Sequence, residues 1–210
     1  MKPRKSYGQF CALARALDRV GDRWTLLVVR ELLLGPQTFR DLRARLPGMS
    51  PSLLVDRLDA LGDDGLVERN AAPARSKSVE YRLTEQGASL EPVVHELIRW
   101  GARWMVTGPG SDQVEPSWGV LALRALIETA PSPDRRSGAV HLDLGDAQAT
   151  VTVRRGERSV SAGQQGRPRA TISASLPSVL AVAAGFRTFS DAGLDVDGDA
   201  TLAAVALAPA

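Results

Sequence analysis

Apolar residues recur at helical spacing through most of the first hundred residues. Segments 10–20 and 24–34 carry apolar side chains at every third or fourth position. Each segment is followed by residues that end helices, Gly21-Asp22 and Gly35-Pro36. This pattern predicts two helices joined by a short turn.

Two further helices are predicted from their N-terminal caps. Thr38 precedes a short segment with one apolar face, and Pro47-Gly48 ends it. Ser50 is followed by Pro51, which suits a first helical turn because its missing N–H is not needed there. A stripe at helical spacing then follows, made of Leu54, Leu58 and Leu61. We therefore expect a helix, a turn over 47–50, and a second helix with one buried face.

After Gly65 the pattern becomes typical of a hairpin. Segments 66–70 and 79–83 read as strands, and the turn-rich, basic segment AAPARSKS lies between them. A long helix is expected after Thr84, in which Pro92 either introduces a kink or marks a separate start.

The stretch 107–117 is rich in glycine, proline and small polar residues and is typical of a linker. We expect it to separate a domain over 1–106 from a second domain over 118–210. In the second domain, helices are predicted at 118–130, 176–184 and 202–207, and strands at 139–144, 149–154, 158–162 and 169–175. The expected fold class is α+β, with an antiparallel sheet in the second domain.

Composition narrows the function classes. The chain has 210 residues, of which 44% are apolar and 24% charged, as in globular proteins. The sequence has no run of about 18 apolar residues and no apolar signal segment, so we expect a cytoplasmic protein with no membrane partner. With one cysteine and two distant histidines, no metal site is expected. No nucleophile-elbow or phosphate-binding glycine motif is present, so we expect neither a cofactor nor enzymatic activity.

Charge divides the chain unevenly. Residues 1–110 hold 17 Lys and Arg against 13 Asp and Glu, whereas residues 111–210 hold 9 against 11. A small positive excess suits nucleic acid only where the charges gather on one face. The two halves are therefore expected to meet different partners.

The first-half elements predict a winged helix-turn-helix domain, an arrangement that binds duplex DNA. The helix after Ser50 can enter the major groove because its leucine stripe faces inward and its outer face is small or polar. On this helix the candidate DNA-binding residues are Ser50, Ser52, Leu53, Asp56 and Arg57. On the preceding helix they are Thr38, Arg40, Arg43 and Arg45. On the wing, Arg75 and Lys77 are expected to reach phosphates or the minor groove.

A specific set of short motifs spans residues 11 to 104. These are Cys11, Gly21-x-x-Trp24, Arg30-Glu31-Leu32, Phe39-x-x-Leu42, Ser50-Pro51-x-Leu53-Leu54, Gly65-Leu66-Val67 and Tyr81-x-Leu83-Thr84-x-x-Gly87. The set resembles the HxlR family of bacterial transcription regulators, relatives of the MarR group. The resemblance implies a homodimer that binds a palindromic operator in double-stranded DNA through paired recognition helices and wings.

The sequence departs from that family at Val55-Asp56, where more strongly hydrogen-bonding, uncharged residues are expected. Asp56 can accept a hydrogen bond from cytosine N4, but its charge repels phosphate. Which residues read the bases therefore stays open.

Residues 170–208 show a strand, a helix, and a Gly-Asp turn that opens a final helix. Together with the preceding strands, this order is similar to sterol-carrier-protein-like domains. The resemblance implies an apolar tunnel between sheet and helices, suited to a hydrophobic small molecule. The alternation along strands and helix predicts a lining by Leu142, Leu144, Val151, Val153, Leu180 and Ala184. The aromatic residues Trp118, Phe186 and Phe189 either line the tunnel or belong to the core.

These inferences predict a homodimeric DNA-binding regulator, a repressor, whose second domain senses a hydrophobic small molecule. Dimerisation is expected through the first helix and the long helix that ends at Trp104, because that helix has more apolar surface than one winged helix can cover. One alternative makes the second domain a structural module without a ligand. Another makes the chain a lipid carrier or enzyme whose winged helix makes protein contacts.

Two smaller features also allow more than one interpretation. Cys11, at a helix N-terminus, is either a redox-sensing thiol or a small buried residue. The segment DVDGDA over 195–200 lacks the spacing of a helix-loop-helix calcium site. It is expected to be a solvated turn, with Asp199 near the start of the last helix.

Overall fold

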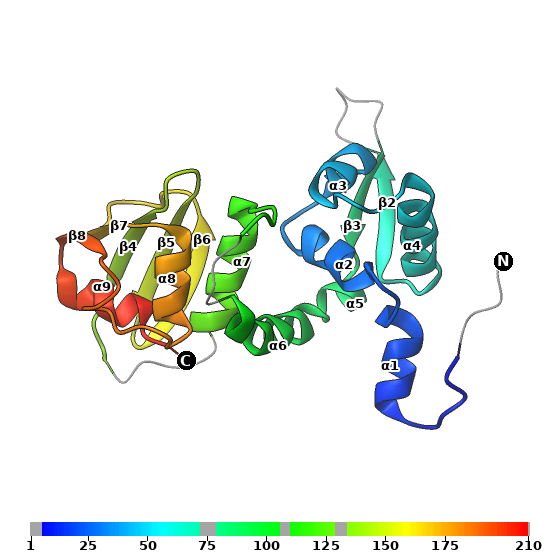
Figure 1. Cartoon of the computed structure of the whole chain (residues 1–210), viewed down its shortest axis with the longest axis horizontal. Coiled ribbons are helices and arrows are strands. Elements are labelled where there is room, and N and C mark those ends of the chain that lie inside the picture. The colour runs from blue at the N-terminus through cyan, green and yellow to red at the C-terminus, as the bar shows by residue number, and fades with distance from the viewer. Residues whose placement is uncertain (1–5, 72–78, 106–109, 129–133, 210) are drawn as a thin grey trace. The chain divides into compact units, whose positions relative to one another are not determined.

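A computed structural model describes residues 6–71, 79–105, 110–128 and 134–209 (Figure 1). The chain divides into two compact units, an N-terminal unit, Met1–Val94, and a C-terminal unit, His95–Ala210. The division falls within a helix, whereas the expected linker begins at residue 107, and 106–109 lie outside the described residues. The domain boundary at 107–117 therefore stays a prediction.

The N-terminal unit combines helices with a small sheet (Figure 1). Its helices are α1 (Ala12–Val20), α2 (Thr25–Leu33), α3 (Phe39–Arg45), α4 (Pro51–Asp63), α5 (Glu85–Ala88) and the start of α6 (Glu91–Gly101). Its strands are β1 (Gln37–Thr38), β2 (Val67–Ala71) and β3 (Val79–Leu83), in the order β1-β3-β2. The predicted helices between residues 10 and 63 and the predicted hairpin are confirmed.

The helical segment expected after Thr84, with either a kink or a separate start at Pro92, consists of two helices. Thr84 does cap a helix, since its hydroxyl accepts a hydrogen bond from the Gly87 N–H, but that helix, α5, ends at Ala88. Pro92 lies in the first turn of α6, where a missing N–H costs nothing, so it marks a separate start. Strand β1 was not predicted, because two residues are too short for an alternation to be recognised.

The C-terminal unit places helices against a five-stranded sheet. The helices are α7 (Pro116–Ile127), α8 (Leu176–Ala183) and α9 (Ala200–Leu207). The strands are β4 (Gly138–Asp143), β5 (Gln148–Arg154), β6 (Glu157–Ala162), β7 (Ala170–Ser173) and β8 (Asp195–Gly198), in the order β6-β5-β4-β7-β8. Helix α6 is followed by a 3-10 turn, η1 (Ala102–Trp104). The α+β class is confirmed.

The expectation of an antiparallel sheet is wrong, because β4 and β7 pair in parallel and make the sheet mixed. The other neighbouring strands are antiparallel. The expected alternation is confirmed: Val140 lies opposite Val151 and Ala170, so these side chains share one face. That face is buried in a core shared with all three helices.

The two edge strands of this sheet, β6 and β8, are protected from pairing with another chain in different ways. Along β6, both backbone groups of Val160 bond to side chains at the end of α7: its carbonyl accepts from Arg124 at 3.1 Å, and its N–H donates to Glu128, the residue that follows the helix, at 2.6 Å. The opposite edge is β8, a short strand with the charged residues Asp195 and Asp197. Short, charged strands resist pairing with another chain.

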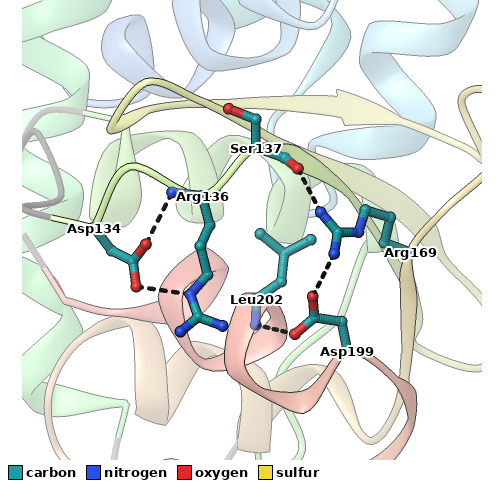
Figure 2. Close-up of polar contacts among 6 residues, drawn as sticks. All are labelled: Asp134, Arg136, Ser137, Arg169, Asp199 and Leu202. Atoms are coloured by element: carbon teal, nitrogen blue, oxygen red, sulfur yellow. Dashed lines mark hydrogen bonds and ion pairs between the residues drawn. The ribbon is translucent and has the colours of Figure 1, made fainter.

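A solvated turn was expected over 195–200, but Asp195–Gly198 form strand β8. Gly198 has φ +93°, and a Cβ there would lie 2.4 Å from the Arg169 carbonyl oxygen, so the strands meet where only glycine fits. Asp199 then caps α9, accepting from the Leu202 N–H at 2.9 Å, and its other oxygen pairs with Arg169 at 2.9 Å (Figure 2). The start of α9 is thereby fixed to β7.

The other end of α9 is held by a buried cation. Arg158 on β6 is 5% exposed, and its guanidinium donates to the carbonyls of Ala208 and Val205. Burial lowers the pKa of Arg158. A cation is favourable here because the C-terminus of a helix carries partial negative charge.

Across the described ranges, every helix is too short or too polar to cross a membrane.

Candidate nucleic-acid interface

Local hydrogen bonds fix the geometry of α3, the turn and α4. The Thr38 hydroxyl accepts from the Asp41 N–H at 3.2 Å, and the Asp41 carboxylate accepts from the Thr38 N–H at 3.2 Å, which closes a capping box at the start of α3. Ser50 caps α4 by accepting from the Leu53 N–H at 3.2 Å. In both cases the side chain positions a helix, as the sequence predicted.

The cap of α3 also changes the pKa of Asp41. The hydrogen bond from Thr38 lowers the pKa of the Asp41 carboxyl, and the charges of Arg45 and Arg40 act in the same direction. The carboxylate therefore stays ionised at the first turn of α3, where negative charge is favourable.

Helix α4 has one buried and one exposed face. Leu54, Leu58 and Leu61 are buried, as expected. Ser52, Val55 and Asp56 are exposed on the face turned away from that stripe, and Val55 has an exposed fraction of 42%. Leu53 is half-buried between the two faces. A helix held from one side and open on the other has the shape that the major groove of DNA accepts.

Two charged residues of α4 bind within the chain. Arg57 pairs with Asp22 at 2.7 Å and donates through Nε to the Arg23 carbonyl at 3.3 Å. Asp59 pairs with Arg69 of β2 at 2.6 Å. Arg57 was predicted to contact DNA, but these partners give it a role in holding α4 to the loop before α2.

The arginines of α3 also divide into exposed residues and a residue that pairs within the chain. Arg40 and Arg43 are exposed. Arg45 lies 3.7 Å from the fully buried carboxylate of Glu31, which also pairs with Arg30 at 2.6 Å. Arg40 and Arg43 are therefore placed to meet a polyanion, whereas Arg45 shares in neutralising a buried charge.

The structure describes the stem of the wing, which is formed by the paired strands β2 and β3. Strands β2 and β3 pair from Val67 opposite Leu83 to Ala71 opposite Val79. The predicted phosphate contacts Arg75 and Lys77 lie outside the described residues.

The sequence interpretation missed two arginines on this stem. Arg69 stacks over the ring of Tyr81 with its guanidinium carbon 5.4 Å from the ring centroid, and Arg82 pairs with Glu68 at 2.6 Å. The strand register shows that Arg69 and Tyr81 are opposite each other, which the sequence shows only once the register is known.

Large apolar side chains remain exposed on two helical segments. On and before α1 they are Tyr7, Phe10, Leu13 and Leu17, and on α6 and η1 they are Val93, Leu97, Trp100 and Trp104. Trp100 and Trp104 meet edge to face, with ring centroids 4.5 Å apart. Val94, by contrast, is buried. Cys11 is exposed just before the first turn of α1 and is not a core residue of this chain.

The expected tunnel residues of the C-terminal unit lie in its packed core. Leu142, Val151 and Val153 are fully buried and Leu144 nearly so. The expectation of space beside them rested on the small residues of α8. Bulky side chains fill that space instead, among them Leu123 and Ile127 of α7 and Leu202 and Leu207 of α9.

A cavity of about 410 Å³ lies at the ends of α8 and α9. Its lining includes Val182, Phe186, Arg187, Phe189, Ala204 and Ala208. Phe186 and Phe189 were predicted as ligand contacts. The other predicted residues, including Trp118, Leu180 and Ala184, do not line this cavity.

Helix α3, the turn, α4 and the β2–β3 hairpin define a winged helix-turn-helix domain. Residues 19–108 match the HxlR-like helix-turn-helix family. Curated relatives include the uncharacterized HTH-type transcriptional regulator YvaP of Bacillus subtilis, 36% identical over 91 residues that cover 43% of this chain and 84% of YvaP. The HTH-type transcriptional regulator YodB of the same species is 32% identical over 93 residues, covering 44% of this chain and 83% of YodB.

Among solved structures, the reduced form of YodB is 31% identical, with a TM-score of 0.41 over 48% of this chain and 99% of that chain. The sequence relatives decide the assignment. The chain belongs to the HxlR-like helix-turn-helix family of transcriptional regulators. The family match ends at residue 108 and does not extend over the sheet and the helices α7 to α9 of the C-terminal unit.

Proposed function

We propose that the chain is a homodimeric transcription repressor that binds a palindromic operator through α4 and the wing. The observation that carries the proposal is the geometry of α4. Its N-terminus is fixed by Ser50, its leucine stripe is buried, and Ser52, Val55 and Asp56 are exposed on its outer face. Such a helix can present base-reading side chains while α3 and the wing contact phosphates.

The exposed apolar side chains support the homodimer. Val93, Leu97, Trp100 and Trp104 follow one another at intervals of four, three and four residues, which is the spacing of a helix-helix seam. The exposed side chains before and on α1 are a second apolar segment that a homodimer can cover. A second copy of the chain would cover these side chains and set two α4 helices about 34 Å apart, one turn of DNA.

For the C-terminal unit we propose a sensor role. The cavity between Phe186, Phe189 and Ala204 has an apolar lining, and its volume of about 410 Å³ suits a small hydrophobic molecule. A sterol-carrier-protein-like identity remains part of this proposal. The competing proposal is a structural module without a ligand, which the dense packing beneath the sheet favours. We further propose a cytoplasmic regulator without enzymatic activity.

The test of DNA binding uses the full chain and a random-sequence duplex library. We expect the wild type to enrich an inverted repeat, and Val55→Glu to lose that selection because it adds a negative charge on the outer face of α4. Ala60→Glu is the matched control, since it adds the same charge at another exposed position of α4. The proposal is wrong if the wild type enriches no sequence, or if Val55→Glu and wild type select equally well.

A further inference from the structure

Arg155 occupies a backbone conformation that arginine rarely adopts. Strands β5 and β6 pair up to Arg154 opposite Glu157, so a two-residue turn of Arg155 and Gly156 joins them. Both residues have positive φ, +53° and +90°, as a type I′ turn requires. Glycine or asparagine suits the first position of such a turn, because a larger side chain is strained there.

The strained residue stands at the tip of a basic end of the C-terminal unit. Gly138, the first residue of β4, pairs with Val153, and the Arg155 N–H donates to the Ser137 hydroxyl at 3.4 Å. Figure 2 shows that Arg169 reaches the same place, donating to the Ser137 carbonyl at 3.1 Å. The arginines brought together at this end are Arg135, Arg136, Arg154, Arg155 and Arg169.

Neighbouring carboxylates neutralise only part of this charge. Arg136 pairs with Asp134 at 3.2 Å and Arg169 with Asp199 at 2.9 Å (Figure 2). Arg135, Arg154 and Arg155 are exposed; Glu157 lies opposite Arg154 in the strand register, but within the described ranges no ion pair engages these three arginines. The opposite end of the sheet, where β4 ends and β8 begins, carries Asp143, Asp146 and Asp195. The C-terminal unit is therefore polarised, although its overall charge is not basic.

We propose that the hairpin tip at Arg155 is a second DNA contact, which binds the phosphate backbone independently of sequence. An arginine there costs folding stability that asparagine would not, and a residue strained in this way points to a role for its side chain in binding. Duplex DNA is the polyanion that a helix-turn-helix regulator meets. The tip belongs to the same chain as the DNA-binding unit, so a contact too weak to bind DNA alone can contribute once α4 is bound.

The test exploits the opposite effects that this position has on folding and on binding. For Arg155→Asn we expect a melting temperature higher by about 3 °C, because asparagine tolerates positive φ. We also expect the plot of log affinity against log salt concentration, measured with the duplex enriched by wild type, to lose about 0.9 of its slope per chain. Arg155→Lys is the matched control: it keeps charge and strain, and should leave both quantities as in wild type.

An unchanged salt slope in Arg155→Asn overturns this proposal and leaves binding through α4 untouched. Absence of any DNA binding by the wild type overturns both. Vesicles containing anionic lipid form a second arm. If Arg155→Asn weakens vesicle binding and not DNA binding, the basic end fits a membrane surface and the DNA proposal is wrong.

Discussion

Individual side chains at the DNA-facing surface divide into those that shape it and those that are open to a ligand. Thr38, Ser50 and Arg57 each satisfy backbone or carboxylate groups of their own chain. Ser52 and Val55 are exposed on the outer face of α4. The sequence predicted both caps, since capping depends on adjacent residues. It did not predict the pairing of Arg57, because Asp22 is distant along the chain and only folding brings it near.

The wing tip gives a prediction at this scale. If the proposed homodimer binds phosphates through Arg75 and Lys77, removing both residues takes away about four contacts per dimer, so the log–log salt slope of DNA binding should fall by roughly 3 to 4. Ser76→Ala, between them, is the control and should keep the slope. A double variant with the wild-type slope would show that the wing does not touch DNA.

Asp41 gives a second prediction, with a defined pH dependence. Its pKa is lowered in the folded state from the ordinary value of 3.8, so its ionised form stabilises the fold above the unfolded pKa, and that contribution is lost as pH falls through the folded pKa. In urea titrations, Asp41→Asn should be less stable than wild type at pH 7, and the difference should shrink towards pH 2. A difference that is constant with pH would contradict this assignment.

At the scale of helices and strands, the sequence predicted most of the fold where one residue pattern runs for five or more positions. It did not predict features that depend on contacts with distant parts of the chain. Strand β8 is four residues long and carries two aspartates, and it exists because β7 offers it hydrogen bonds. The parallel pairing of β4 with β7 depends on the tertiary fold, and the alternation of apolar residues along a strand does not show the direction of its neighbour. Likewise, the expected tunnel was filled by side chains of α7 and α9, whose positions the strand pattern does not fix.

Helix α6 provides the prediction at this scale. Leu97→Lys places a charge in the exposed apolar stripe and should convert the dimer to monomers, with at least tenfold weaker operator binding because paired α4 helices are lost. Gln86→Lys, an exposed position on α5, is the control for added charge. Light scattering reads the mass. A wild-type monomer at micromolar concentration, or a dimeric Leu97→Lys variant, would contradict the proposed interface.

For the whole molecule, the central question is whether the cavity in the C-terminal unit takes a ligand. A hydrophobic compound present at 100 times its dissociation constant should raise the unfolding free energy by about 2.7 kcal/mol. With decanol as the probe, Ala204→Phe should abolish the thermal shift by filling the cavity, whereas Ala12→Phe, on exposed α1, should keep it. Equal shifts in wild type and Ala204→Phe would place decanol elsewhere. The absence of a wild-type shift would favour the structural module.

The covered edge of β6 has a consequence for the life of the protein in the cell. An open strand edge can act as a template on which other chains pair. Arg124 of α7 and Glu128, the residue that follows this helix, occupy the backbone groups of Val160. At this position the edge of β6 therefore needs neither a further strand nor a partner chain to bind its backbone groups. Helix α7 thus contributes to long-term solubility as well as to the core.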